Sequence, residues 1–242
     1  MNKKIVIGNL FPELLNLYGD IGNIDILSMR CKWRGIEVEL HNYSPGEKIN
    51  INNLDIIFLG GGSDREQEIC CNYLRKIKKE IFYYIENEGV FLSICGGYQL
   101  LGEYYETKNK KIKGLGILDM KTIYGRNRLI GNIIIKSNIF SRNINIVGFE
   151  NHMGKTYHKY NPLGKVVYGY GNNGEDKNEG IIYKNFFGSY LHGPLLSKNP
   201  ELSDFILFKI LNRKYGIKNI ISLDDYFEKK AKETVLNRYI RI

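Results

Sequence analysis

The chain has 242 residues, 43% hydrophobic and 25% charged, which is typical of a soluble globular protein. No stretch reaches the roughly 20 consecutive apolar residues of a transmembrane helix, and the apolar run after the basic N-terminus is too short for a signal peptide, so we expect a cytoplasmic protein with no membrane span. The net charge of +9 comes from scattered basic residues without a nucleic-acid-binding motif, so we expect solvated helix faces and no nucleic-acid partner.

Strands and helices alternate through the first hundred residues. Apolar periodicity predicts strands near residues 4–8, 36–41, 54–59 and 90–94, and helices near 20–34, 65–87 and after 97. Asp20 is the expected cap of the first of these helices. This alternation indicates a parallel sheet with helices on both faces, in which functional residues lie at the carboxyl ends of the strands.

The pattern changes after about residue 112. Short β-like segments follow near 118–124, 129–136, 144–149, 165–169 and 180–191, and two helices near 199–215 and 223–240 end the chain. We interpret the β-like segments as a meander or a mixed extension of the sheet. The sequence therefore predicts a flavodoxin-like α/β fold, with a mixed, mostly parallel sheet flanked by helices and a β-rich C-terminal half. Because no linker, repeat or low-complexity tract interrupts it, we expect a single domain over residues 1–242.

The most informative motif is the strand Val90–Ile94 followed by Cys95, Gly96 and Gly97 and then a helical pattern. A sharp strand-to-helix turn exposes the side chain at its corner, and the helix N-terminus beside it favours a thiolate over a thiol. A lone cysteine at a strand end can also be a small buried hydrophobe. The two glycines favour a nucleophile, because they clear space where a substrate approaches.

A cysteine nucleophile needs a base, and four histidines are available. His192 follows an apolar strand and precedes a Gly-Pro turn, so it also lies at a strand end, where it is either catalytic or structural. We expect His41 at an edge of the sheet, and His152 and His158 lie in turn-rich sequence. Gly60–Gly62 follow the strand before Cys95 and offer backbone N–H groups for an oxyanion hole, or form a simple tight turn.

Other motifs carry no function in this sequence. The four cysteines show no C-x-x-C spacing, so the sequence indicates neither a zinc site nor a thioredoxin-type redox pair, and we expect a thiol protein of a reducing compartment. Residues 169–174 fit the dinucleotide pattern G-x-G-x-x-G, but a turn-like segment follows instead of a helix. Residues 148–156 resemble a phosphate loop with one residue too many between its glycines. We expect neither a metal nor a cofactor.

Seven motifs resemble class I glutamine amidotransferase domains of the cobyric acid synthase type. They span nearly the whole chain in the family's order: LYGDIGN at 17–23, GGGSDREQ at 60–67, ICGGYQ at 94–99, NRL at 127–129, VGFENH at 147–152, YGYGNN at 168–173 and YLHGP at 190–194. The resemblance implies that fold, and it implies that Cys95 attacks the side-chain amide of L-glutamine while His192 transfers the proton. It also implies that Arg128, otherwise an ordinary surface arginine, holds the glutamine carboxylate, and that Gly61 and Gly96 form the oxyanion hole.

The chain departs from the wider class at one position. Many class I domains carry Glu two residues after the histidine, where this sequence has Pro194. Either the Cys95–His192 pair suffices, or another carboxylate orients His192, and a partner subunit could supply it.

The resemblance is closest to members that act as separate glutaminase subunits, which implies a heterodimer with a MurT-type Mur ligase. That partner would use ATP and ammonia to amidate the D-glutamate of the lipid II stem peptide in peptidoglycan biosynthesis. The chain itself has no nucleotide-binding motif, which fits this division of labour. The alternatives are an amidotransferase for another acceptor, such as a cobalamin-pathway acid, a flavodoxin-like binding module in which Cys95 is structural, and a cysteine hydrolase of peptides.

Overall fold

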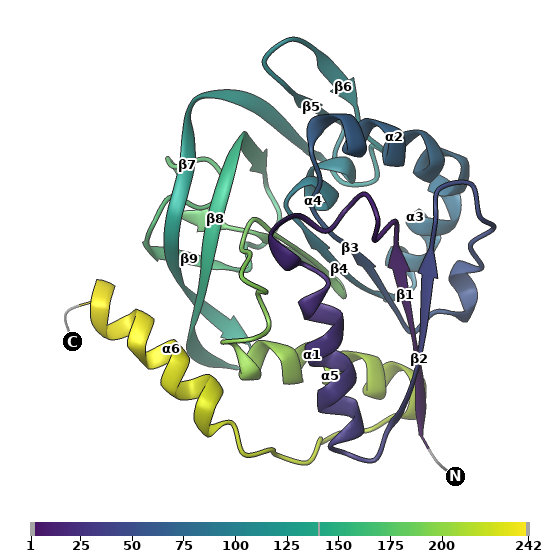
Figure 1. Cartoon of the computed structure of the whole chain (residues 1–242), viewed down its shortest axis with the longest axis vertical. Coiled ribbons are helices and arrows are strands. Elements are labelled where there is room, and N and C mark those ends of the chain that lie inside the picture. The colour runs from purple at the N-terminus through teal and green to yellow at the C-terminus, as the bar shows by residue number, and fades with distance from the viewer. Residues whose placement is uncertain (1–2, 140, 241–242) are drawn as a thin grey trace.

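The computed structural model describes residues 3–139 and 141–240, and its centre is a six-stranded sheet (Figure 1). The strand order is β11-β12-β4-β3-β1-β2. Its members are β1 (Lys4–Leu10), β2 (Glu37–Tyr43), β3 (Ile56–Leu59), β4 (Val90–Ile94), β11 (Ile181–Tyr183) and β12 (Phe186–Ser189). Only the β11–β12 pair is antiparallel, so the mixed, mostly parallel sheet predicted from the sequence is confirmed.

Helices cover both faces of this sheet because its central strands are apolar on both sides. In β3, Ile56 and Phe58 pack into one core cluster with α1 (Gly22–Lys32) and α5 (Pro200–Tyr215). Ile57 and Leu59 pack into the other cluster with α2 (Asp64–Leu74) and α3 (Lys78–Glu86). Such continuous apolar strands are typical of parallel sheets buried between helices.

The helix predicted over residues 65–87 is two helices. A capping box begins α2: the Ser63 N–H donates to the Glu66 carboxylate at 2.8 Å, and the Glu66 N–H donates to the Ser63 hydroxyl. A 3-10 turn (Arg75–Ile77) then separates α2 from α3, and Ile77 leaves the helical range at φ −115°. Four of residues 75–79 are basic, and like charges three or four positions apart destabilise a continuous helix.

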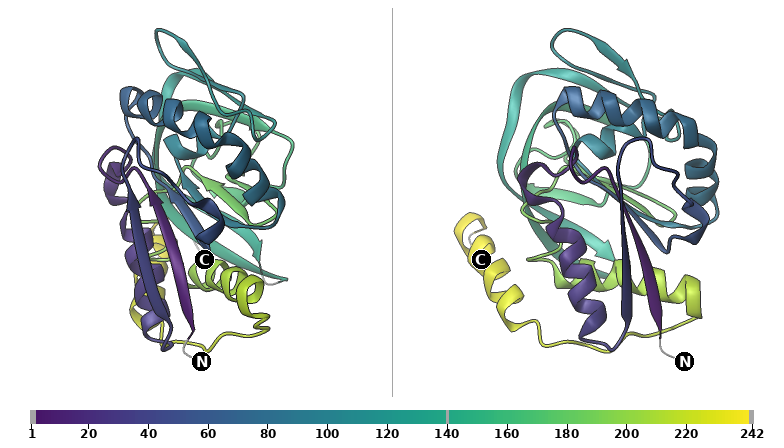
Figure 2. Two further views of the ribbon diagram at one scale, coloured as in Figure 1. Left: turned by 90° about the vertical axis from the view of Figure 1, so that its right-hand side faces the viewer. Right: turned by 45° about the vertical axis from the view of Figure 1, so that its right-hand side comes forward.

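Most β-strands of the C-terminal half form a second sheet, and β11 and β12, from the segment expected near 180–191, extend the first sheet, so the expected extension is confirmed for that segment and wrong for the others. The order of the second sheet is β10-β9-β7-β5-β6, with β8 paired to β7. Its members are β5 (Tyr104–Glu106), β6 (Lys111–Lys113), β7 (Met120–Ile139), β8 (Arg142–His158), β9 (Gly164–Tyr168) and β10 (Asn178–Glu179). The β5–β6 hairpin projects beyond the body of the molecule (Figure 2).

The short segments predicted near 118–149 are parts of one long β7–β8 hairpin. The two strands pair along almost their whole length, and this pairing overrides the local turn signals of their glycines and asparagines. The register shifts between Tyr124 and Leu129, where a bulge interrupts β7. A backbone bridge between Phe149 of β8 and His192 joins the second sheet to the first. The assignment of residues 1–242 to a single domain stays a prediction.

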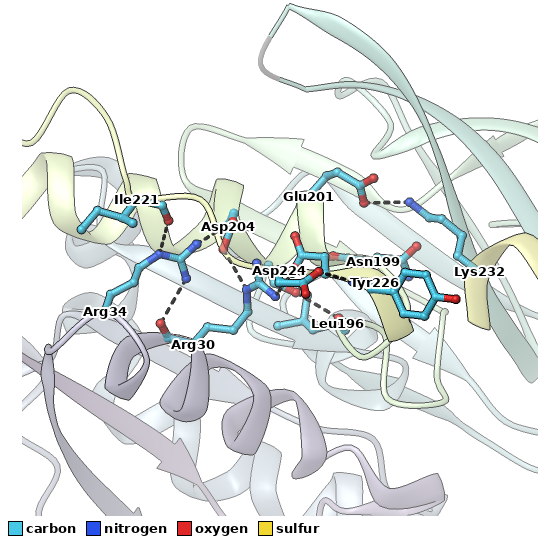
Figure 3. A network of polar contacts seen from close by, with 12 residues as sticks. Arg30, Arg34, Leu196, Asn199, Glu201, Asp204, Ile221, Asp224, Tyr226 and Lys232 are labelled. Atoms are coloured by element: carbon cyan, nitrogen blue, oxygen red, sulfur yellow. Dashed lines mark hydrogen bonds and ion pairs between the residues drawn. The ribbon is translucent and has the colours of Figure 1, made fainter. Parts of the chain in front are cut away.

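A buried ion-pair network fixes the C-terminal segment and helix α6 (Tyr226–Tyr239) to the body (Figure 3). The Arg30 side chain of α1 is 2% exposed, and it donates to Asp204 of α5 at 2.8 Å and to Asp225 before α6 at 2.7 Å. Arg34 donates to Asp204 at 2.7 Å and to the Ile221 carbonyl at 2.7 Å. None of the helices in the described ranges combines the length and apolarity that a membrane crossing requires.

Replacing Arg30 with Met should lower the free energy of unfolding by about 3 kcal/mol, because it removes the cation that pairs with the largely buried Asp225 and leaves Asp204 with Arg34 alone. Urea denaturation measures this change. Lys4→Met is the matched control: the Lys4–Glu39 pair is about 40% exposed on both sides, so its loss should lower the free energy of unfolding far less. Equal losses in the two variants would contradict a structural role for the buried network.

Candidate active site

Cys95 stands at a strained corner between β4 and the short helix α4 (Gly96–Leu100), as the motif predicts. Its backbone has φ 49° and ψ −108°, a conformation that L residues rarely adopt. The corner is held by hydrogen bonds from the Cys95 N–H to the Ser189 carbonyl at 2.8 Å and from the Gly97 N–H to the Gly60 carbonyl at 3.1 Å. A Cβ atom on Gly97 would lie 2.5 Å from the Leu59 carbonyl oxygen, so the chain needs glycine there. This geometry is a nucleophile elbow.

The structure brings His192 to this corner, as the sequence predicts. Strand β12 lies parallel to β4, with Ser189 opposite Ile94, so the residues after β12 emerge at the same sheet edge as Cys95. The His192 ring is 1% exposed, and its backbone N–H is bonded to the Phe149 carbonyl at 2.8 Å. A Cβ atom built on Gly61 would lie 3.1 Å from the Cys95 Cβ and 3.5 Å from the His192 Cε1, which places both side chains around one small volume.

Asp20 is the functional residue that the sequence reasoning missed. One of its carboxylate oxygens lies 2.8 Å from Nδ1 of His192, and the carboxylate is fully buried. Asp20 was expected to cap α1, but the helix begins after Ile21 without a side-chain cap. The available signals were its position in the loop after β1, at the sheet edge that carries Cys95, and its place in the LYGDIGN motif. The chain therefore contains its own carboxylate for His192.

The electrostatics of the three residues favour a charged imidazole. Burial alone lowers the pKa of His192, but its hydrogen bonds and charge attraction to Asp20 and Cys95 outweigh burial and raise the pKa to about 10. Nε2 of His192 is buried and has no hydrogen-bond partner in the described part of the chain, so it is unoccupied on the side of the ring opposite the Asp20 contact. The imidazolium carries a proton that it can give to a leaving group.

The prediction of Gly61 as an oxyanion-hole donor needs correction. The Gly61 N–H donates to the second carboxylate oxygen of Asp20 at 3.0 Å, so it is already used to orient that carboxylate. The N–H groups of Gly62 and Gly96 have no hydrogen-bond acceptor among residues 3–139 and 141–240. Gly96 follows the nucleophile directly, and Gly62 lines the cavity that Cys95 enters. Backbone N–H groups beside a nucleophile are suited to stabilise a developing oxyanion.

A cavity of about 400 Å³ opens at Cys95, which is large enough for a free amino acid. Arg128 lines it from the β7 bulge and donates to the Asn151 side chain at 2.6 Å, while Asn151 donates to the Tyr18 hydroxyl at 2.5 Å. The Tyr18 ring in turn packs edge-on against His192, with ring centroids 4.9 Å apart. Arg128 is therefore at the cavity, as predicted, and the sequence reasoning missed the roles of Asn151 and Tyr18.

The other candidate motifs have contacts of their own, and the 148–156 segment lines the Cys95 cavity with Asn151, His152, Met153 and Gly154. His152 is in strand β8 instead of a turn, where it donates from Nδ1 to the Gly154 carbonyl at 2.6 Å and stacks on Tyr190. The 169–174 loop uses its backbone N–H groups at Tyr170 and Gly171 to bind the buried Glu150. The described residues contain no group of three or more His, Cys, Asp or Glu side chains placed to hold a metal ion.

The elbow, the histidine and the two-sheet fold define a glutamine amidotransferase domain. Residues 6–200 match the model of the CobB/CobQ-like glutamine amidotransferase domain, and the chain belongs to this family. Among solved structures, the fold is similar to PurLQS from Thermotoga maritima, with a TM-score of 0.60 and 18% identity over 88% of this chain and 99% of that one. A glutamine amidotransferase from Thermotoga maritima gives a TM-score of 0.54 over 96% of this chain and 94% of that one.

Among curated relatives, the lipid II isoglutaminyl synthase (glutamine-hydrolyzing) subunit GatD of Staphylococcus aureus is 46% identical over 97% of this chain and 96% of its own length. The subunit of the same description from Streptococcus pneumoniae is 45% identical over 88% of this chain and 83% of its own length. A probable cobyric acid synthase from Methanococcus maripaludis is 33% identical over 72% of this chain, but the match covers only 36% of that longer protein.

Proposed function

We propose that this chain is the glutaminase subunit of a lipid II isoglutaminyl synthase. It hydrolyses L-glutamine and passes the ammonia to a MurT-type Mur ligase subunit, which amidates the D-glutamate of the lipid II stem peptide. The single observation that carries the glutaminase activity is the buried Asp20–His192 pair, with a 2.8 Å contact, beside the strained Cys95. The acceptor is inferred from the GatD subunits of Staphylococcus aureus and Streptococcus pneumoniae. Each match covers most of this chain and most of the relative.

The chemistry follows from the positions of these groups. The Cys95 thiolate attacks the side-chain amide carbon of glutamine, and the N–H groups of Gly96 and Gly62 stabilise the oxyanion that forms. The His192 imidazolium protonates the amide nitrogen, so ammonia leaves and a thioester to Cys95 remains. Water, deprotonated by the now neutral His192, attacks the thioester and releases glutamate. Asp20 fixes the ring orientation and stabilises its charge in both steps.

Arg128 binds the α-carboxylate of glutamine in this proposal, and a planar guanidinium suits that task. Replacing Arg128 with Met should raise KM for glutamine about 10- to 100-fold and change kcat little, because the carboxylate contact is the same in the ground state and the transition state. Steady-state ammonia release measures both constants. Arg126→Met is the matched control, since Arg126 lies in the same bulge but does not line the Cys95 cavity. A large drop in kcat with unchanged KM would contradict this role.

We further propose a cytoplasmic heterodimer, because the ligase reaction consumes ATP and the chain has no nucleotide-binding motif of its own. An acceptor from the cobalamin pathway is a weaker alternative, since the cobyric acid synthase relative is less similar and the match covers about a third of its length. The non-catalytic binding module does not account for the Cys–His–Asp arrangement, and a cavity of about 400 Å³ suits a free amino acid better than the peptide of a peptide hydrolase.

The test of the acceptor is a reconstituted reaction. The chain, the MurT-type ligase subunit from the same genome, ATP, L-glutamine and lipid II are combined, and the stem peptide is analysed by mass spectrometry. Conversion of D-glutamate to D-isoglutamine that needs both subunits would support the proposal. Glutamine hydrolysis without lipid II amidation would keep the glutaminase and reject this acceptor.

A further inference from the structure

The Gln67 side chain of α2 lies beside the two backbone N–H groups that are suited to stabilise an oxyanion, those of Gly62 and Gly96. Its amide donates from Nε2 to the Gly62 carbonyl at 2.8 Å. A Cβ atom built on Gly96 would lie 2.4 Å from the same Nε2 atom and 2.5 Å from the amide carbon, so the amide group packs directly on the Gly96 backbone. One side chain therefore contacts both residues that supply the donors.

The loop of three glycines at 60–62 is fixed by a hydrogen bond to each of its carbonyl groups. The first carbonyl accepts from the Gly97 N–H at 3.1 Å, the second from the Leu17 N–H at 2.9 Å and the third from the Gln67 side chain. The bond from Leu17 fixes the planar peptide group before Gly62, and the bond from Gln67 fixes the one after it. Because glycine adopts many backbone conformations, losing either bond frees the Gly62 backbone to rotate.

Gln67 occupies a helix position where an apolar residue is common. Ser63 is the N-cap of α2, so Gly62 is the residue before the cap and Gln67 is the fourth residue of the helix. At the start of many helices these two positions carry apolar side chains that pack against each other. In this chain a hydrogen bond from a side-chain amide to a backbone carbonyl takes the place of that apolar contact.

Hydrogen bonds satisfy only part of the Gln67 amide. The residue is 4% exposed, and its Oε1 atom has no hydrogen-bond partner in the part of the chain that the structure describes. Turning the amide over would place Oε1 against the Gly62 carbonyl oxygen, and two oxygens repel, so the bond requires Nε2 on that side. An unpaired buried oxygen lowers stability, and such a cost is typical of residues kept for function.

We propose that Gln67 is a positioning residue for glutamine hydrolysis, which holds the N–H groups of Gly62 and Gly96 in the orientation that stabilises the oxyanion. This inference rests on the proposed function. Gln67 lines the Cys95 cavity, but it acts on the reaction through the two glycines. Its contribution should therefore appear in the transition state, where charge develops on the amide oxygen of the substrate, and not in the binding of glutamine.

Gln67→Met keeps the length of the side chain and removes its donor. With L-glutamine as substrate, kcat should fall about 10- to 100-fold and KM should change by less than about threefold. Gln67→Asn keeps an amide but is too short to reach the Gly62 carbonyl, so it should lose as much. Steady-state ammonia release, with the ligase subunit present, gives both constants. Asn72→Met is the matched control, because it makes the same kind of change at an exposed position of α2 and should alter neither constant.

Alkylation of Cys95 by iodoacetamide separates this role from a general disturbance of the site. The reaction uses the same sulfur nucleophile but forms no oxyanion, so its rate in Gln67→Met should equal the wild-type rate. A wild-type kcat in either Gln67 variant, or an alkylation rate that falls as much as kcat, would overturn the role of Gln67 while the glutaminase proposal stands. A wild-type chain that releases no ammonia from glutamine would reject the proposed function, and this role with it.

Discussion

Replacing Asp20 with Asn should lower kcat for glutamine hydrolysis about 10²- to 10⁴-fold and leave KM nearly unchanged. The substitution keeps the shape of the side chain but removes the charge that stabilises the His192 imidazolium. The amide can also present its N–H to Nδ1 of His192, which selects the wrong tautomer. Because Asp20 is fully buried and its other oxygen accepts from the Gly61 N–H, solvent cannot replace it.

The pH profile distinguishes this role from a merely structural one. The interaction with Asp20 raises the pKa of His192, to about 10 in the intact site, so the charged form persists well above neutral pH. Without the carboxylate this pKa falls, and the loss of activity at high pH should begin at a lower pH in Asp20→Asn than in the wild type. Asp25→Asn, an exposed position on α1, should change neither the rate nor the profile. An Asp20→Asn enzyme with at least a tenth of wild-type kcat and an unshifted profile would exclude Asp20 from the mechanism.

Replacing Cys95 with Ala should abolish ammonia release from L-glutamine, a loss of about 10⁴-fold or more, because the acyl intermediate cannot form. Coupled detection of glutamate and ammonia over long incubations measures the residual rate. Cys31→Ala is the control, since burial raises the pKa of the Cys31 thiol to about 12 and keeps it unreactive. Residual hydrolysis within tenfold of the wild type in Cys95→Ala would mean that another group carries out the reaction.

The sequence predicted those site residues that follow directly after strands of the first sheet. Cys95 follows a buried apolar strand and precedes two glycines, and His192 follows another such strand, so sheet geometry alone places both at one edge. The fold class followed from the same alternation of strands and helices, and its family assignment is confirmed by the match over residues 6–200.

The part that was missed depends on contacts between distant segments. Asp20 lies 172 residues before His192, and no local pattern distinguishes it from a helix cap. Pro194 stands where many domains of the wider class carry glutamate, which left the third residue open, and only the folded chain shows which carboxylate faces the imidazole. The same contact uses the Gly61 N–H, which a glycine-rich loop by itself does not reveal.

The long β7–β8 hairpin was missed for a related reason. Its glycines and asparagines are turn formers in isolation, and only pairing with a partner strand of similar length keeps them extended. The bulge within β7 then carries Arg128 to the cavity. Sequence alone gave no reason to choose this arginine over Arg126, and the family resemblance supplied that choice.

The most direct test of the central claim is to treat the chain with a diazoketone analogue of glutamine and map the modified residue by peptide mass spectrometry. Our account predicts a single adduct on Cys95 that stops ammonia release, is slowed by excess L-glutamine, and is absent from Cys95→Ala. Adducts on other cysteines, or continued ammonia release after complete modification of Cys95, would contradict it.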